Sequence, residues 1–196
     1  MDLESCRKKL EKLEAARETL LKLTREMKIN ATKAIASIHS NQDFSKHLNR
    51  ALEIMEEVHK FKEEYPEIYY AITHDSMQEV VEAYCLSKVV NDEFKFEFDE
   101  LKAEPAAIVT GLADLIGELR RCALTKLMKG EFDDAEKLIK LMEKIYFELI
   151  SFSSFPDRLV PNLRPKLDVA RGSIERTKSD YIAAKVARLN EALDRT

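Results

Sequence analysis

Residues 105–119 read PAAIVTGLADLIGEL, and the only charged side chains among them are Asp114 and Glu118. The chain as a whole is 35% charged, so a stretch of this length would ordinarily hold about five charges. The proline at its start suits the first turn of a helix. The stretch therefore predicts a helix that is buried on most of its surface, with two carboxylates at i, i+4 spacing on one face.

A second stretch has the same character. Residues 77–90 read MQEVVEAYCLSKVV, and Glu79 and Glu82 stand at i, i+3 on one helix face. Burying four carboxylates without a cation is costly, and pairing or metal coordination removes most of that cost. The two stretches together favour a divalent-metal site between two helices. The alternative for Glu79 and Glu82 is a solvated face, although the apolar residues around them leave little polar face to solvate.

Composition indicates an all-α protein. The 196 residues include only 4 Gly and 5 Pro, too few for the turns of a sheet protein of this size. With 45% hydrophobic residues, the length suits a single helical domain over residues 1–196. We expect a bundle of about six or seven long helices.

Apolar residues recur at helical spacing along most of the chain. They predict helices over residues 3–38, 44–58 with Asp43 as N-cap, 66–90, 105–130, 133–152 and 167–189. Between residues 91 and 105, Phe94, Phe96 and Phe98 alternate with charges, as in a short strand or an extended loop. The first helix would be roughly 50 Å long, which is more than one small bundle can cover. We therefore expect part of its apolar stripe to pack on another subunit.

Charge and cysteine content limit the class of protein. The net charge of −4 gives no overall attraction to nucleic acid or to anionic membranes, so RNA binding would need a local basic surface. No apolar run is long enough to span a membrane, and the charged N-terminal sequence is unlike a signal peptide. Cys6, Cys85 and Cys122 are unclustered and each lies in a helical pattern, which predicts reduced core cysteines in a cytoplasmic protein.

The candidate ligands are all carboxylate oxygens, which suit Mg²⁺, Mn²⁺ or Ca²⁺. A di-iron bundle needs Glu-x-x-His on two helices, and the one match, Glu56 to His59, lies in a charged stretch typical of a surface. Gly111 and Gly117 lie three residues either side of Asp114 and remove side-chain bulk around it. They indicate the close approach of a helix, of a metal with its waters, or of a substrate.

Two arginines follow the acids. Arg121 is seven residues after Asp114, two turns along the same face, and Arg120 adjoins it. Carboxylates beside arginine fit phosphodiester chemistry, in which acids hold a metal and a guanidinium binds phosphate. An ion pair between Arg121 and a carboxylate explains the same pattern equally well.

Three segments resemble the translin superfamily, and in particular its TRAX branch. GLADLIGELRR, residues 111–121, is similar to the TRAX signature, and MQEVVEA, residues 77–83, is similar to a second motif of that branch. LLKLTREM, residues 20–27, is similar to a third, and Lys33 and His39 match a basic residue and a histidine. The segments occur in the family's order, and the similarity spans most of the chain.

The resemblance implies an all-α protein that assembles into a hollow oligomer and binds single-stranded nucleic acid or encloses RNA. It also implies a Mg²⁺-dependent endoribonuclease, with Mn²⁺ as the other suitable ion. The metal-binding and catalytic acids would be Glu79, Glu82 and Asp114, and Glu118 would be a fourth ligand or a partner of Arg121. The same resemblance completes the set of residues expected to bind RNA, which is Arg121, Arg120, Arg25 and Lys33.

The chain departs from animal TRAX in having no basic N-terminal arm and no long insert between the two acidic motifs. A compact prokaryotic or archaeal form, without a separate translin partner, is therefore expected. The function predicted is metal-dependent endoribonuclease activity on single-stranded or short RNA. The alternative is a translin-type oligomer that binds single-stranded nucleic acid without cleaving it, in which the acids only pair with Arg121 or Lys33.

Overall fold

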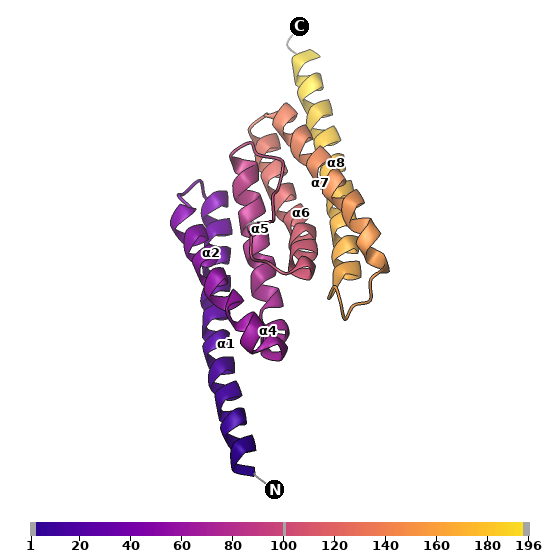
Figure 1. Cartoon of the computed structure of the whole chain (residues 1–196). Helices are drawn as coiled ribbons and strands as arrows, with labels where there is room; N and C mark the ends of the chain where they lie inside the picture. Colours follow the sequence, from indigo (N-terminus) through magenta and orange to yellow (C-terminus); the bar gives the residue numbers. More distant parts are fainter. Residues whose placement is uncertain (1–2, 100, 194–196) are drawn as a thin grey trace. The chain divides into compact units, whose positions relative to one another are not determined.

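The computed structural model describes residues 3–99 and 101–193, and helices make up most of both ranges. The elements are α1 (Leu3–His39), α2 (Ser45–His59), α3 (Phe61–Glu64), α4 (Pro66–Ile72), α5 (His74–Val90), α6 (Pro105–Met128), α7 (Phe132–Ile150), the 3-10 helix η1 (Ser151–Ser154) and α8 (Leu163–Leu193) (Figure 1). No strand is present in the two described ranges, so the all-α prediction is confirmed. None of the helices there is long and apolar enough to cross a membrane.

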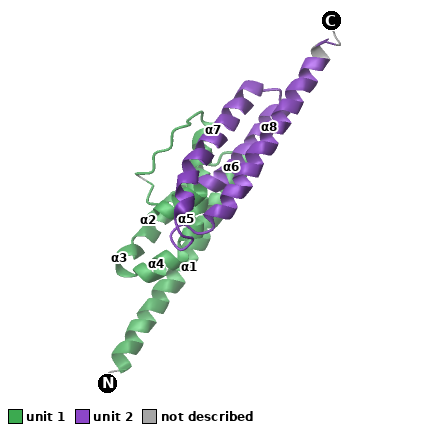
Figure 2. Cartoon of the chain, turned by 90° about the vertical axis from the view of Figure 1, so that its right-hand side faces the viewer, with its two compact units in different colours: residues 1–111 green, residues 112–196 purple. Residues whose placement is uncertain are grey.

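The chain forms two compact units, residues 1–111 and 112–196, and the boundary falls within α6 (Figure 2). A single domain over residues 1–196 stays a prediction.

In unit 1, the second half of α1 packs against α2 and α5. The packed face of α1 carries Leu20 and Met27 and continues through Ala31 and Ala34, all of which are fully buried. Small residues in this part of the stripe allow neighbouring helices to approach closely. The first half of α1 differs, because its apolar residues are exposed: Leu3, Leu10 and Leu13.

The helix predicted from Pro66 to Val90 is divided at Thr73 into α4 and α5. The Thr73 hydroxyl donates to the carbonyl of Tyr69, and the Ser76 hydroxyl donates to the carbonyl of Thr73. Hydroxyls that bond back to the helix backbone loosen its own hydrogen bonds and bend it. This bend lies just before the acidic motif of α5.

The segment after α5 is an extended loop, one of the two forms expected for it. Asp92 has a positive φ of 61° where the chain leaves the helix. Phe94, Phe96 and Phe98 are half-buried, and the rings of the last two are in contact. Residue 100 lies outside the described ranges. Leu101 is buried again, so the loop returns to the core before α6 begins.

In unit 2, α7 packs against α8. Gly130 ends the preceding helix as expected, with φ of 74°. Its N–H donates to the carbonyl of Leu127, and that of Glu131 donates to Lys126, which is the Schellman pattern of a helix end. The C-terminal half of α8 exposes its apolar residues, as α1 does at its start: Ile182, Val186, Leu189 and Leu193.

Candidate active site

Two of the predicted acids lie on α5 in unit 1. Glu82 is buried, with 8% of its surface exposed, and Glu79 is half-buried. The hydroxyl of Thr32 on α1 donates a hydrogen bond of 2.7 Å to Oε1 of Glu79. Neither acid therefore lies on a freely solvated face, which was the alternative to a ligand role. The contact with Thr32 fixes the orientation of one carboxylate oxygen of Glu79.

The surroundings of Glu82 are strongly desolvated. Cys85 is one turn further along α5, and burial raises the pKa of its thiol far above the usual range. The negative charge of Glu82 raises that pKa further. A thiol of this kind stays protonated. The prediction of a free core cysteine is right for Cys85 and wrong for Cys6, which is exposed on α1.

Gly111 marks a close approach of α6 to α5. A Cβ atom placed on Gly111 would lie 2.8 Å from the carbonyl oxygen of Gln78 and 2.9 Å from the side chain of Val81. Glycine is therefore required here for helix packing, the first of the explanations offered by the sequence. Gly117 differs, because a Cβ there would meet no atom within 4 Å.

In unit 2, Asp114 of α6 binds the ammonium group of Lys166, in the first turn of α8. Nζ of Lys166 lies 2.7 Å from Oδ1 and 2.6 Å from Oδ2 of Asp114. Both side chains are less than one third exposed. Both oxygens of the carboxylate are thus directed at a cation.

Glu118 lies one turn after Asp114, and Oε2 of Glu118 is 4.0 Å from a guanidinium nitrogen of Arg121. At this distance the two side chains form a weak ion pair, and the role of Glu118 as a fourth ligand stays a prediction. The guanidinium of Arg121 remains largely exposed. Burial, with the negative charge of Glu118 in second place, raises the pKa of Cys122 to about 11.

Arg120 is held inside unit 2. Its guanidinium donates to Oγ1 of Thr177 and to Oδ2 of Asp180, each at 2.9 Å, and so ties α6 to α8. Thr177 is fully buried. These bonds give Arg120 a structural function, which makes Arg121 the better candidate for binding phosphate. Arg25 and Lys33 are both exposed on α1.

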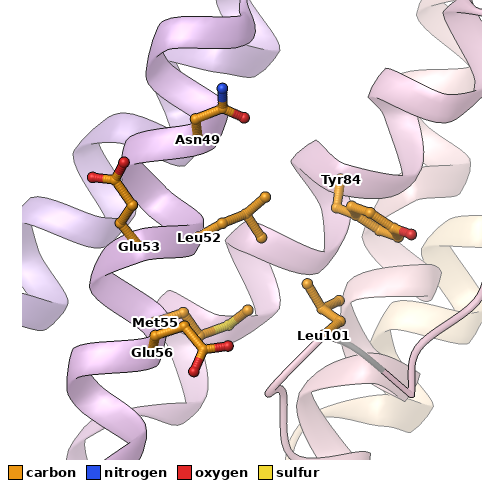
Figure 3. Close-up of a pocket in the computed structure, with 7 residues that line it drawn as sticks. All are labelled: Asn49, Leu52, Glu53, Met55, Glu56, Tyr84 and Leu101. Carbon is orange, nitrogen blue, oxygen red and sulfur yellow. The ribbon is translucent and has the colours of Figure 1, made fainter.

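A cavity of about 480 Å³ lies elsewhere in unit 1 (Figure 3). Its walls come from α2, from Tyr84 of α5 and from Leu101 of the loop before α6. Glu79 and Glu82 do not line it. The cavity is therefore separate from the predicted acids of that unit.

The donor chemistry fits a divalent metal, but the ligands are not gathered into one cluster. Within the two described ranges, no group of three or more His, Cys, Asp or Glu side chains could hold a metal ion. The carboxylates of Glu79 and Glu82 in unit 1, and of Asp114 in unit 2, are the hard oxygen donors that Mg²⁺ and Mn²⁺ prefer. The ammonium group on Asp114 shows that this carboxylate already accommodates a positive charge.

Comparison with known protein families covers the acidic helices α5 and α6 and most of the rest of the chain. The Translin family model matches residues 4–181, which include most of each unit and every predicted site residue. The chain belongs to the translin family. This confirms the translin-superfamily, TRAX-like assignment that the motifs on α1, α5 and α6 implied.

Relatives of this translin-family protein cover nearly its whole length. An uncharacterized protein of Methanocaldococcus jannaschii is 34% identical over 175 residues, which are 86% of this chain and 76% of the relative. The protein in the structure of the AfC3PO–duplex RNA complex is 56% identical in sequence to this chain. The match covers 97% of this chain and 100% of the AfC3PO chain, with a TM-score of 0.92. Apo-NeC3PO, at 21% identity and a TM-score of 0.82 over 93% of this chain and 97% of that one, shares the fold.

Sequence reasoning did not find Thr32 or Lys166, which contact two of the predicted acids of this translin-family protein. Thr32 is 47 residues from Glu79, and Lys166 is 52 residues from Asp114. Lys166 follows a proline-rich loop, and nothing in its local sequence distinguishes it from the exposed lysines of the chain. Only the packing of α1 on α5 and of α8 on α6 identifies them.

Proposed function

We propose that this translin-family protein binds RNA and cleaves it as a metal-dependent endoribonuclease. The observation that carries the proposal is its 56% identity, over 97% of the chain, to AfC3PO, which has been solved in complex with duplex RNA. RNA cleavage is supported by the paired acids on α5 and α6, since carboxylates on largely buried helices are costly unless they serve a cation.

Glu79, Glu82 and Asp114 are the residues proposed to hold Mg²⁺ or Mn²⁺. When bound, such an ion would supply Lewis-acid chemistry: it would polarise the scissile phosphate and lower the pKa of a water molecule. Attack by that water on phosphorus would break the bond to the 3′ oxygen and leave a 3′-hydroxyl and a 5′-phosphate. Thr32 orients Glu79. The packing of α6 on α5 at Gly111 brings the first turns of α6 against the helix of Glu79 and Glu82.

Arg121 is proposed to contact an RNA phosphate, since its guanidinium is largely exposed and only weakly paired with Glu118. Arg25 and Lys33 add exposed positive charge along α1. A guanidinium matches phosphate geometry through two parallel hydrogen bonds, and such contacts position the backbone without reading bases. Binding through the phosphate backbone does not depend on the base sequence of the RNA. Because AfC3PO was solved with duplex RNA, the binding assay should include duplex as well as single-stranded RNA.

The protein is also proposed to self-associate into a hollow oligomer that encloses short RNA. The exposed apolar residues of α1 and of the C-terminal half of α8 support self-association, because long apolar stripes are stable in water only when something covers them. In an oligomer, the exposed apolar residues of α1 and α8 in one copy would be covered by those of a neighbouring copy.

The alternative function is RNA binding without cleavage. The observation in its favour is that Asp114 and Glu118 already have cationic partners, Lys166 and Arg121. In that case the acids would serve only to hold the helices and orient the arginine.

One experiment separates the two functions. Purified protein is incubated with end-labelled RNA, single-stranded and duplex, with Mg²⁺, with Mn²⁺ and with EDTA. The proposal expects cleavage with either metal, none with EDTA, and products that carry 3′-hydroxyl ends. A contaminating ribonuclease of the metal-independent kind leaves 2′,3′-cyclic phosphates instead. RNA that is bound but never cut would establish the alternative.

A further inference from the structure

Residues 3–15 at the start of α1 are all exposed, although the second half of the same helix is packed in the core of unit 1. Figure 1 shows this part of α1 extending beyond α2 and α4. An isolated helical segment of this length is only marginally stable in water. Its exposed apolar side chains form one stripe along the helix, which we call the N-terminal stripe: Leu3, Cys6, Leu10 and Leu13.

The N-terminal stripe has the spacing of a coiled coil. Its members alternate at intervals of three and four residues, and the alternation continues through Arg17 into the buried half of α1, at Leu20, Thr24, Met27, Ala31, Ala34 and Ile38. A strict seven-residue repeat keeps one face of a helix turned toward a partner helix. In the second half of α1 the partners are α2 and α5 of the same chain. The N-terminal stripe presents the same repeat at the surface.

Charges beside the N-terminal stripe favour a second copy of the same helix as its partner. With Leu3 as an a position of the heptad abcdefg, Lys9 is a g residue and Glu14 is the e residue of the next heptad. In a parallel pair of helices, a g residue lies beside the following e residue of the other helix. Lys9 would therefore lie beside the partner's Glu14, and symmetry repeats this contact. Within one helix the two residues are five apart and do not face each other.

The same charges disfavour an antiparallel pair. The antiparallel register that covers the whole N-terminal stripe places Cys6 opposite the partner's Leu10. In that register Lys9 lies beside the partner's Lys9, and Arg7 lies beside the partner's Arg7. Like charges at these flanking positions repel each other, so orientation is decided by charge while the apolar stripe supplies the attraction.

We propose that residues 3–14 of α1 form a parallel two-stranded coiled coil with the same segment of a second copy. This inference rests on the self-association in the proposed function and specifies one of its contacts. The segment continues a helix that is already formed in unit 1, so pairing does not have to nucleate it. Arg17, at the next a position, binds Glu14 and Glu18 of its own helix and ends the apolar run.

Cys6 provides a direct test with the natural chain. In a parallel pair, two d residues face each other within the separation that a disulfide requires. The full chain is treated with the thiol oxidant diamide and analysed on a denaturing gel without reducing agent. We expect a covalent dimer and no larger species. Cys6→Ser should give no dimer, which excludes Cys85 and Cys122 as the source.

A second control moves the thiol around the helix. Cys6→Ser combined with Lys8→Cys places the only exposed thiol at an f position, on the side of α1 opposite the N-terminal stripe. This variant should not form the covalent dimer. A dimer from both positions would show random collision of exposed thiols and would overturn the parallel contact, as would a wild type that is oligomeric but forms no dimer.

A charge exchange tests the contact between Lys9 and the partner's Glu14. Lys9→Glu and Glu14→Lys should each weaken association on the order of tenfold, because two attractive pairs become repulsive. The two changes together only exchange the charges and should restore the wild-type association. Light scattering on dilution measures all three variants. Lys12→Glu is the matched control, since it makes the same charge change away from the N-terminal stripe and should have no effect.

Two failures are distinguishable. If Leu10→Glu with Leu13→Glu dissociates the oligomer, but Cys6 does not cross-link and the charge exchange does not restore association, another helix covers the N-terminal stripe. The parallel coiled coil is then wrong and the proposed self-association stands. If the wild type is a monomer by light scattering and does not cross-link, both the coiled coil and the proposed self-association are wrong.

Discussion

The hydroxyl of Thr32 on α1 donates a hydrogen bond of 2.7 Å to Oε1 of Glu79 on α5. A residue of the longest helix thus orients a predicted catalytic acid that is 47 residues away. The contact depends on the close packing of α1 against α5, which the buried Ala31 and Ala34 permit. The first helix of the chain therefore contributes to the candidate active site as well as to the core.

Thr32→Val should lower metal-dependent RNA cleavage by about fivefold, since a side-chain hydrogen bond contributes about 1 kcal/mol to the orientation of its acceptor. The variant keeps the shape of threonine, so the fold and RNA affinity should remain. Initial rates measured over a range of Mg²⁺ concentrations test this. Thr19→Val is the control, because the Thr19 hydroxyl bonds only the helix backbone at Ala15. Equal rates for Thr32→Val and the wild type would exclude the orienting role.

Asp114→Asn and Glu79→Gln should each abolish cleavage and leave RNA binding intact or slightly tighter. Both changes remove a ligand charge, and in the absence of metal they also remove repulsion between a carboxylate and phosphate. Filter binding in EDTA and cleavage in Mg²⁺ measure the two effects separately. Near-normal cleavage by either variant would mean that the acids are assigned wrongly.

Arg121→Ala should weaken RNA binding for all sequences and reduce the slope of log K against log salt by about 1, as expected for the loss of one phosphate contact. Arg171→Ala is a suitable control, because Arg171 is similarly exposed and also pairs with an acid one turn away, Asp168. A salt slope that does not change in Arg121→Ala would identify a structural ion pair with Glu118 instead.

Arg120→Ala should destabilise the protein by about 1–3 kcal/mol, because charge-assisted bonds from Arg120 to Thr177 and Asp180 are lost between α6 and α8. Denaturation in urea measures the change in the free energy of unfolding. Arg121→Ala, next in the chain, should lie within about 0.5 kcal/mol of the wild type. The opposite ranking, with Arg120→Ala as stable as the wild type but weak in RNA binding, would move the phosphate contact to Arg120.

Leu10→Glu combined with Leu13→Glu should dissociate the proposed oligomer, since both leucines are exposed on the first half of α1. Light scattering at micromolar concentration reports the molar mass. Lys12→Glu changes charge on the same turn without removing an apolar group and should leave the assembly intact. A wild type that is monomeric and fully active would rule out the enclosed chamber.

Local sequence determined most of the helices. The first helix, Pro105 as the start of α6 and Gly130 at its end follow from patterns that act over a few residues. The bend at Thr73 was missed, because the hydroxyl groups that cause it compete with a helical apolar pattern that continues on both sides. The extended loop with Phe94 and Phe96 was one of two forms that period-2 alternation allows, and an isolated strand has no partner for its backbone groups.

The sequence by itself also determined which acids to suspect, because charge is rare on helices that must be buried. Only the tertiary structure decided what each acid contacts. Thr32 on Glu79, Lys166 on Asp114 and the anchoring of Arg120 on α8 are contacts across 47 to 60 residues of chain. Such contacts depend on how helices pack side by side. Periodicity shows which face of a helix is buried, but it does not show which residue of another helix lies opposite that face.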